Sequence, residues 1–208
     1  MSRERALAPP LERWLAALLA TPGLTAIKDP VEARRVHVDD ALAALPLLRD
    51  GPLVDVGSGG GSPGLPLAWA RPDLEVVLLE ASRRKHAFLE RVAVDFPNVS
   101  AVWARAEEHG RSSGRDAYAS AVARALASPP TAVEWCLPLV RPGGNLVLYV
   151  GESPPGLDRV AGALGASGPE EVAVEGSARR RLLVFRKLVP TPERFPRRTG
   201  TARKRPLS

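Results

Sequence analysis

Residues 53–61 read Leu-Val-Asp-Val-Gly-Ser-Gly-Gly-Gly, a short apolar strand that runs directly into a glycine-rich loop. Glycine has no Cβ atom, so it lets a backbone turn sharply and approach a ligand closely. In open α/β sheets, ligands bind at the carboxyl ends of the strands, and this loop falls at such an end. The stretch therefore predicts a nucleotide-type cofactor site after the first strand.

Strand-like and helix-like segments alternate along most of the chain. The centre of the second strand, residues 76–79, is continuously apolar, which is typical of a parallel strand covered on both faces. Repeated strand–helix units predict an α/β fold with a doubly wound, mostly parallel, Rossmann-like sheet. Residues 151–168, rich in glycine and proline, are not assigned to an element. We expect strands at 53–56, 75–80, 98–103, 117–123, 145–150 and 182–186, the last closing the sheet, and helices at 11–20, 30–45, 64–70, 82–94 and 131–140.

Composition divides the chain into three parts. We expect an N-terminal helical cap at residues 1–50, a cofactor-binding domain at 51–189 and a basic tail at 190–208. The net charge is +6, and the tail holds six basic side chains against one acidic side chain. Such a short run, rich in Arg and Pro, cannot fold alone. Its charge would attract a polyanion such as RNA, or would only keep the protein in solution.

Composition also excludes several classes of protein. Apolar residues make up 45% of the chain, which is enough for a core, so global disorder is not expected. One cysteine, Cys136, excludes an intramolecular disulfide framework and a Cys-based zinc cluster. No apolar run reaches the roughly 18 residues that cross a bilayer. We expect a cytoplasmic monomer that uses neither a metal nor a membrane.

One reading of the glycine loop is a dinucleotide site. The spacing Gly59-x-Gly61-x-x-Gly64 matches the fingerprint of NAD-dependent enzymes, although this pattern alone is weak. Pro63 and Pro66 make a long pyrophosphate-binding helix after the loop less natural. A dehydrogenase therefore stays open but is disfavoured.

The other reading of the loop is an S-adenosylmethionine site. The overlapping run Asp55-x-Gly57-x-Gly59-x-Gly61 places its acid within the strand. A methionine-derived sulfonium carries no phosphate, so it does not require an anion-binding helix. Glu80 ends the second strand and can accept hydrogen bonds from both ribose hydroxyls of either cofactor. These residues favour a methyltransferase.

Further short motifs occur in a fixed order along the chain. Together they resemble the RsmG (GidB) family of small-subunit rRNA guanine-N7 methyltransferases, and the resemblance covers about residues 24–207. The motifs are Leu24–Ile27, His37-x-x-Asp40, Asp55–Gly61, Pro63–Leu67, Arg105–Glu108, Ala123–Ala127, Pro142–Gly144 and Thr191–Gly200.

The resemblance implies a class I methyltransferase that uses S-adenosyl-L-methionine and methylates N7 of a guanosine in 16S rRNA, either free or in the small ribosomal subunit. It places Gly57 and Ser62 at the cofactor and the pair Ala106-Glu107 at its adenine end. Arg124 would face both the cofactor and the target base, so it is the expected catalytic residue. Ser62 stands where the family usually has an aromatic or aliphatic residue.

The chemistry implied by this resemblance needs little acid–base help. Guanine N7 already carries an in-plane lone pair, so no general base is required, and the protein contributes mainly by positioning. Two basic groups are candidates for RNA phosphate contacts, one at the start of the helix after Glu80 and one in the tail. For the first group, a solvated helix face is the alternative. The candidates are Arg83, Arg84, Lys85, Arg197, Arg198, Arg203, Lys204 and Arg205.

Two other functions remain open from the sequence. A related methyltransferase acting on another RNA or on a small molecule is one, because Val150 stands where the family usually has a lysine. A non-catalytic RNA-binding assembly factor that keeps the cofactor fold is the other. Binding of S-adenosylmethionine distinguishes the second from the first.

Overall fold

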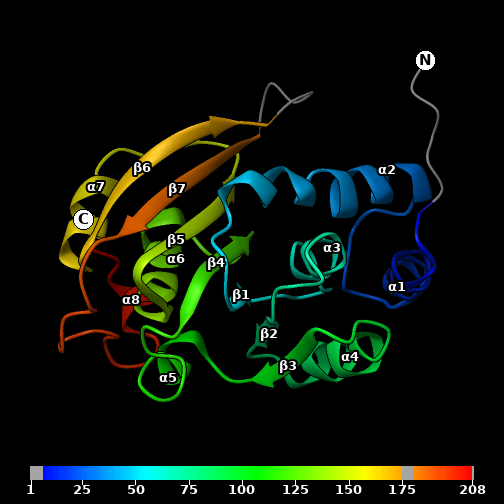
Figure 1. Cartoon of the computed structure of the whole chain (residues 1–208), viewed down its shortest axis with the longest axis horizontal. Helices are drawn as coiled ribbons and strands as arrows, with labels where there is room; N and C mark the ends of the chain where they lie inside the picture. The colour runs from blue at the N-terminus through cyan, green and yellow to red at the C-terminus, as the bar shows by residue number, and fades with distance from the viewer. Residues whose placement is uncertain (1–6, 175–179, 208) are drawn as a thin grey trace.

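The computed structural model describes residues 7–174 and 180–207, and within them seven strands form one sheet (Figure 1). The strand order is β3-β2-β1-β4-β5-β7-β6. Strands β1 to β5 pair in parallel, whereas β7 pairs antiparallel with β5 and with β6. This arrangement confirms the predicted doubly wound, mostly parallel sheet. The strands are β1 (Leu53–Val56), β2 (Val76–Glu80), β3 (Val99–Trp103), β4 (Tyr118–Arg124), β5 (Val140–Val150), β6 (Ala166–Ala173) and β7 (Arg181–Lys187).

Helices cover both faces of the sheet (Figure 1). One face carries α1 (Pro9–Ala20), α2 (Pro30–Arg34), the π-helical turn η1 (Arg35–Asp39), the 3-10 helix η2 (Ala41–Leu47), α3 (Gly64–Ala70) and α4 (Arg83–Ala93). The other face carries α5 (Ala106–His109), α6 (Pro129–Cys136), the 3-10 helix η3 (Leu137–Leu139), α7 (Leu157–Ala163) and α8 (Thr201–Lys204).

The strand β1 shows why the sheet needs helices on both sides. Successive side chains of a strand point to opposite faces. Leu53 packs into the core with α1 and α3, while Val54 and Val56 pack into the core with α6 and η3. All three are at most 1% exposed, and full burial of such a side chain contributes roughly 1.5–3 kcal/mol. The strand order reverses between β1 and β4, which is where doubly wound sheets hold their ligand.

Two predicted elements differ from the structure. The strand at 181–187 does not close the sheet, because β6 pairs outside it. The β6 strand contains Gly168 and Pro169 and changes register between Ser167 and Glu170. This interruption breaks the polar–apolar alternation by which a strand is recognised in a sequence. The single helix expected at 30–45 is three helical segments, α2, η1 and η2.

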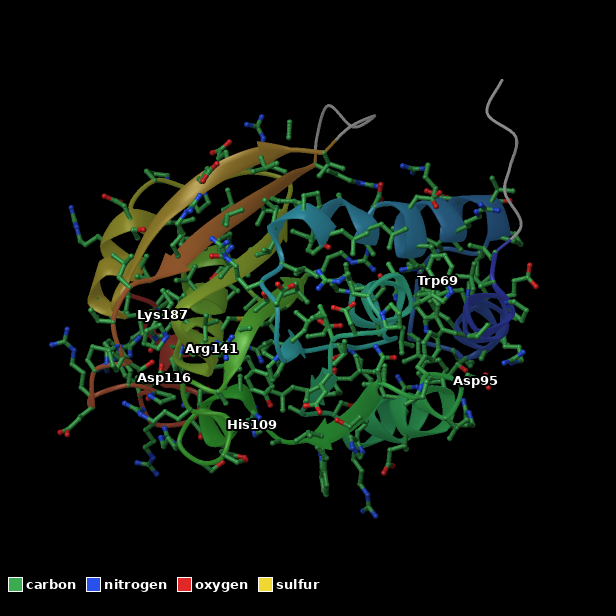
Figure 2. All side chains as sticks on the ribbon, in the orientation of Figure 1. Trp69, Asp95, His109, Asp116, Arg141 and Lys187 are labelled. Atoms are coloured by element: carbon green, nitrogen blue, oxygen red, sulfur yellow. The ribbon has the colours of Figure 1, made fainter. Side chains whose placement is uncertain are left out.

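The C-terminal segment, residues 190–207, packs against the domain. Phe195 is 3% exposed, and Arg115 donates to the carbonyl oxygens of Phe195 and Thr191 at 2.6 and 2.7 Å. Buried Lys187 donates to Thr191 Oγ1 at 2.5 Å and pairs with Asp116 at 3.2 Å. Figure 2 shows Lys187 and Asp116 at one end of the molecule, and Figure 1 shows α8 at that same end. A segment too short to fold alone is thus held in place by the body of the protein.

Candidate functional site

The glycine-rich loop after β1 turns through the left-handed region of the backbone. Gly57, Gly59 and Gly61 have φ angles of +71°, +58° and +97°, where a side chain costs about 1–2 kcal/mol. A Cβ atom on Gly57 would lie 2.4 Å from Leu126 Cδ1. A Cβ atom on Gly59 would meet the carbonyl oxygen of Gly57 at 3.7 Å, an ordinary contact. The loop therefore needs glycine for its shape, and it leaves open space in front of Gly59.

Asp55, in β1, joins the start of this loop to its end at Gly64. Its side chain is 1% exposed, and its Oδ2 accepts a hydrogen bond from the Gly64 amide at 2.9 Å. Its Oδ1 has no hydrogen-bond partner among the described residues. Burial raises the pKa of Asp55 to about 7. Asp55 thus fixes the start of α3 and shapes the cradle for a ligand.

Glu80 ties the loop to the end of β2. Its Oε2 accepts from the Gly59 amide at 2.9 Å, and its Oε1 accepts from the Ser82 amide at 2.7 Å. Each carboxylate oxygen has a second lone pair, so both remain able to accept a ribose hydroxyl. The side chain is 7% exposed, and it lines a cavity at the strand ends.

Two cavities lie at the carboxyl ends of the strands and share Gly57, Lys85 and Ala125 as lining residues. The first, of about 440 Å³, is bounded by the loop, Arg124 and the N-terminal segment. The second, of about 400 Å³, is bounded by Glu80 and residues that follow β3. The two cavities thus adjoin at the glycine-rich loop, and Glu80 lines the second of them.

The predicted adenine contacts lie in the second cavity. Ala106 and Glu107 both line it. Glu107 is 5% exposed, and its Oε1 accepts from the Gly200 amide at 2.9 Å, so it also holds the C-terminal segment. Arg203 of α8 lines the same cavity, whereas the sequence suggested only an RNA contact for it. The C-terminal segment therefore forms part of the wall of the second cavity.

Arg124, at the end of β4, lines the first cavity. Its Nη1 donates to the Val36 carbonyl oxygen at 2.6 Å, and its Nη2 lies 3.0 Å from His37 Nδ1. Burial lowers the pKa of Arg124 from its usual value. Ser62 lies close by, because its hydroxyl donates to the His37 carbonyl oxygen at 2.7 Å. The N-terminal turn η1 therefore positions both predicted site residues.

The predicted RNA contacts divide into two groups. Arg83 and Arg84 are exposed at the start of α4, and the next residue, Lys85, lines both cavities. The exposed ring of Trp103 lies beside them, with the Arg83 guanidinium 5.8 Å from its centroid. The first group thus borders the cofactor site.

The second group is in the C-terminal segment. Arg197 has a protein partner, since it pairs with the carboxylate of buried Glu134. The others are exposed: Arg198, Arg203, Lys204 and Arg205. Contacts of both groups with RNA stay a prediction.

Sequence reasoning missed several residues that face the first cavity. The residues are Thr25, His37, Asp40, Tyr149 and Arg180, which all line it. The motif His37-x-x-Asp40 is the signal that points to two of them. Among the described residues, no group of three or more His, Cys, Asp or Glu is placed to hold a metal ion. In the same residues, no helix is long and apolar enough to cross a membrane.

Solved structures with a similar fold include methyltransferases. A 16S rRNA adenine-N1 methyltransferase from Catenulisporales acidiphilia, solved with its S-adenosylmethionine cosubstrate, matches with a TM-score of 0.57 at 17% identity, over 74% of this chain and 92% of that chain. Fibrillarin from Methanococcus jannaschii, a pre-rRNA processing protein, matches with a TM-score of 0.55 at 15% identity, over 71% and 74%. At this identity the likeness concerns the fold.

Sequence relatives show the family. The model of the GidB family, described as rRNA small subunit methyltransferase G, matches residues 11–156. The Ribosomal RNA small subunit methyltransferase G of Moorella thermoacetica is 39% identical over 88% of this chain and 82% of that protein. The protein of the same name from Synechococcus elongatus is 38% identical over 88% and 82%. This chain therefore belongs to the rRNA small subunit methyltransferase G family, and its cofactor is S-adenosylmethionine.

Proposed function

We propose that this chain transfers a methyl group to N7 of a guanosine in the 16S rRNA of the small ribosomal subunit. The observation that carries this proposal is the state of the acid–base groups in the first cavity. Both ring nitrogens of His37 have protein partners, Asp40 pairs with Arg180, and the Tyr149 hydroxyl donates to the Ala41 carbonyl oxygen. Each of these three groups is therefore already in contact with another part of the protein.

This arrangement selects among the possible target atoms. An exocyclic amine or a hydroxyl must lose its proton during methylation, so it benefits from a base within hydrogen-bond reach. Guanine N7 has a free lone pair and loses no proton. A cavity with partnered acid–base groups therefore suits N7, and catalysis rests on holding the base in line with the methyl donor.

The cofactor residues fit the donor. S-adenosylmethionine supplies an electrophilic methyl group when bound. Glu80 offers two acceptor oxygens for the ribose. The open space before Gly59 leaves room for the part of S-adenosylmethionine that joins its adenosine to its amino-acid end. Ala106 and Glu107 line the second cavity, where we place the adenine. Arg124, fixed by η1, is placed to orient the target guanine or a neighbouring phosphate.

The surface around the site suits RNA. Lys85 lines both cavities, and the two residues before it, Arg83 and Arg84, are exposed. Such cations bind phosphates and make affinity depend on salt. Methylation inside a cavity requires an unstacked base, which a single-stranded loop provides readily. We propose that the protein acts on this RNA in the cytoplasm as a monomer.

Nucleoside analysis tests the proposal. Small ribosomal subunits from a strain that lacks the gene are incubated with the protein and methyl-labelled S-adenosylmethionine, and the digested rRNA is analysed by mass spectrometry. The proposal predicts label in 7-methylguanosine from 16S rRNA. The Gly59→Arg variant, whose side chain fills the space before the loop, is the control without transfer. Label in another nucleoside, or no label, would contradict the proposal.

A further inference from the structure

The hydrogen bonds of His37 determine which of its ring nitrogens carries the proton. The guanidinium of Arg124 has donors and no acceptor, so Nη2 donates to His37 Nδ1 across 3.0 Å. A nitrogen that accepts carries no proton, and the proton of the neutral imidazole is therefore on Nε2. Burial, and then the charge of Arg124, lowers the pKa of His37 to about 4, so the ring is neutral at pH 7.

This protonation state fixes the role of Thr25. His37 Nε2 lies 2.9 Å from Thr25 Oγ1 and donates to it. The amide of Ile27 donates to the same oxygen at 3.1 Å. A hydroxyl oxygen has two lone pairs, and these two donors fill both. The Thr25 hydroxyl can then act only as a donor, and within residues 7–174 and 180–207 no acceptor is assigned to its proton.

The position of Thr25 indicates where this proton is used. Thr25 is partly exposed and lines the first cavity, together with Gly59, Ser62 and Arg124. A hydroxyl with both lone pairs filled presents its O–H to whatever occupies the space beside it. The Thr25 hydroxyl therefore favours a ligand atom that accepts a hydrogen bond over one that donates.

The π-helical turn η1 explains how His37 reaches both partners. The Asp40 amide donates to the Arg35 carbonyl oxygen at 3.0 Å, the wide spacing of a π-helix. The next two carbonyl oxygens accept hydrogen bonds from side chains outside the turn. Arg124 donates to the carbonyl oxygen of Val36, and Ser62 donates to that of His37. Single π-helical turns occur frequently at functional sites. Here the turn joins the N-terminal segment to the cofactor loop and to β4.

We propose that Thr25 is a ligand-binding residue that donates its hydroxyl hydrogen bond to an acceptor oxygen in the first cavity, and that His37 is the positioning residue that orients this hydroxyl and the Arg124 guanidinium together. The inference rests on the proposed function. Two ligands bring such an oxygen to this cavity, the carboxylate of S-adenosylmethionine and the O6 carbonyl of the target guanine.

The variant Thr25→Val tests the hydroxyl, since valine keeps the shape and loses the donor. A hydrogen bond to a charged group contributes roughly 1.5–3 kcal/mol and a neutral one about 1 kcal/mol. If the cofactor carboxylate is the acceptor, the Kd for S-adenosylmethionine in calorimetry rises about tenfold or more. If guanine O6 is the acceptor, this Kd is unchanged and kcat/KM for the rRNA falls roughly fivefold. Thr25→Ser, which keeps the hydroxyl, should behave nearly as wild type.

Two variants of His37 test its positioning role. His37→Asn keeps an acceptor near the Nδ1 position for Arg124 but loses the donor to Thr25, whereas His37→Ala loses both. We expect His37→Asn to reproduce the defect of Thr25→Val and His37→Ala to exceed it. Because His37 and Thr25 act through one hydrogen bond, the combined Thr25→Val and His37→Asn variant should be little worse than either alone.

A spectroscopic measurement is independent of activity and of variant folding. Long-range 15N–1H NMR of the histidine side chains should show His37 with its proton on Nε2 at pH 7. The opposite tautomer, or wild-type cofactor binding and rRNA kinetics in Thr25→Val, would overturn the inference. If the rRNA is not a substrate at all, the proposed function fails, while the tautomer and the cofactor titration still test the role of Thr25.

Discussion

Arg197 of the C-terminal segment forms a bidentate ion pair with Glu134 of α6. Its Nε and Nη2 each lie 2.5 Å from a carboxylate oxygen. The Glu134 side chain is 2% exposed, whereas that of Arg197 is 26% exposed. A buried carboxylate without its cation is costly, so this contact holds in place the C-terminal segment that lines part of the second cavity.

Replacing Arg197 with alanine should therefore destabilise the protein. We expect Arg197→Ala to lower the free energy of unfolding by about 3 kcal/mol in urea denaturation, because Glu134 would stay buried without a partner. Arg198→Ala is the matched control, since Arg198 is exposed, and its effect should stay within about 0.5 kcal/mol. Equal effects of the two variants would show that the pair does not hold the segment.

Gly59→Ala should weaken cofactor binding without a large loss of stability. Its φ of +58° costs an alanine about 1–2 kcal/mol, and the new methyl group enters the space in front of the loop. Gly143→Ala carries a similar backbone penalty at φ +84°, and its methyl group meets no described atom within 4 Å. Calorimetry with S-adenosylmethionine should show a higher Kd for Gly59→Ala alone. A higher Kd in both variants would assign the defect to stability.

Asp55 and His37 should make opposite contributions to the pH dependence of stability. Burial raises the folded pKa of Asp55 from 3.8 to about 7, so the folded chain holds a proton that the unfolded chain has released. Its contribution therefore falls as the pH rises from about 4 to about 7. Burial lowers the folded pKa of His37 from 6.5 to about 4, so the unfolded chain holds the extra proton. That contribution falls as the pH drops from about 6.5 to about 4.

Each variant should expose the contribution of the other residue. In urea denaturation between pH 4 and 8, Asp55→Asn should gain stability as the pH rises to about 6.5. His37→Asn should lose stability as the pH rises to about 7. Parallel pH profiles for the two variants would contradict the buried environments described for these side chains.

Lys85→Gln should weaken RNA binding in a salt-dependent way. Lys85 lines both cavities, where a phosphate of the substrate can approach it. Removing one phosphate contact should reduce the slope of log affinity against log salt concentration by about 1. Arg159→Gln, an exposed change on α7, is the control and should leave the slope unchanged. An unchanged slope for Lys85→Gln would remove this residue from the RNA interface.

The parts of the fold that the sequence predicts correctly are those encoded locally. The apolar strand that ends at Val56 and the glycines that follow it encode the turn after β1 within a few consecutive residues. Glu80 likewise ends the next parallel strand. The edge strand β6 is missed because Gly168 and Pro169 interrupt its pattern. Its partner β7 supplies the hydrogen bonds that keep it in the sheet.

The network around Arg124 depends on contacts between distant parts of the chain. Arg124 meets Val36 and His37 from 88 and 87 positions away, and Glu107 meets Gly200 across 93 positions. Spacing along the sequence carries no signal for such pairs. The family resemblance indicated Arg124 and Glu107 as site residues, whereas the roles proposed for Thr25 and His37 rest on hydrogen bonds in the folded chain.

The most direct test of the central claim removes the target atom. Small subunits are reconstituted with 16S rRNA transcribed either with guanosine or with 7-deazaguanosine, which has a C–H group in place of N7. Incubation with the protein and methyl-labelled S-adenosylmethionine should label the guanosine rRNA and leave the 7-deazaguanosine rRNA unlabelled. Equal labelling of the two would show that the methyl group goes to another atom and would contradict the account.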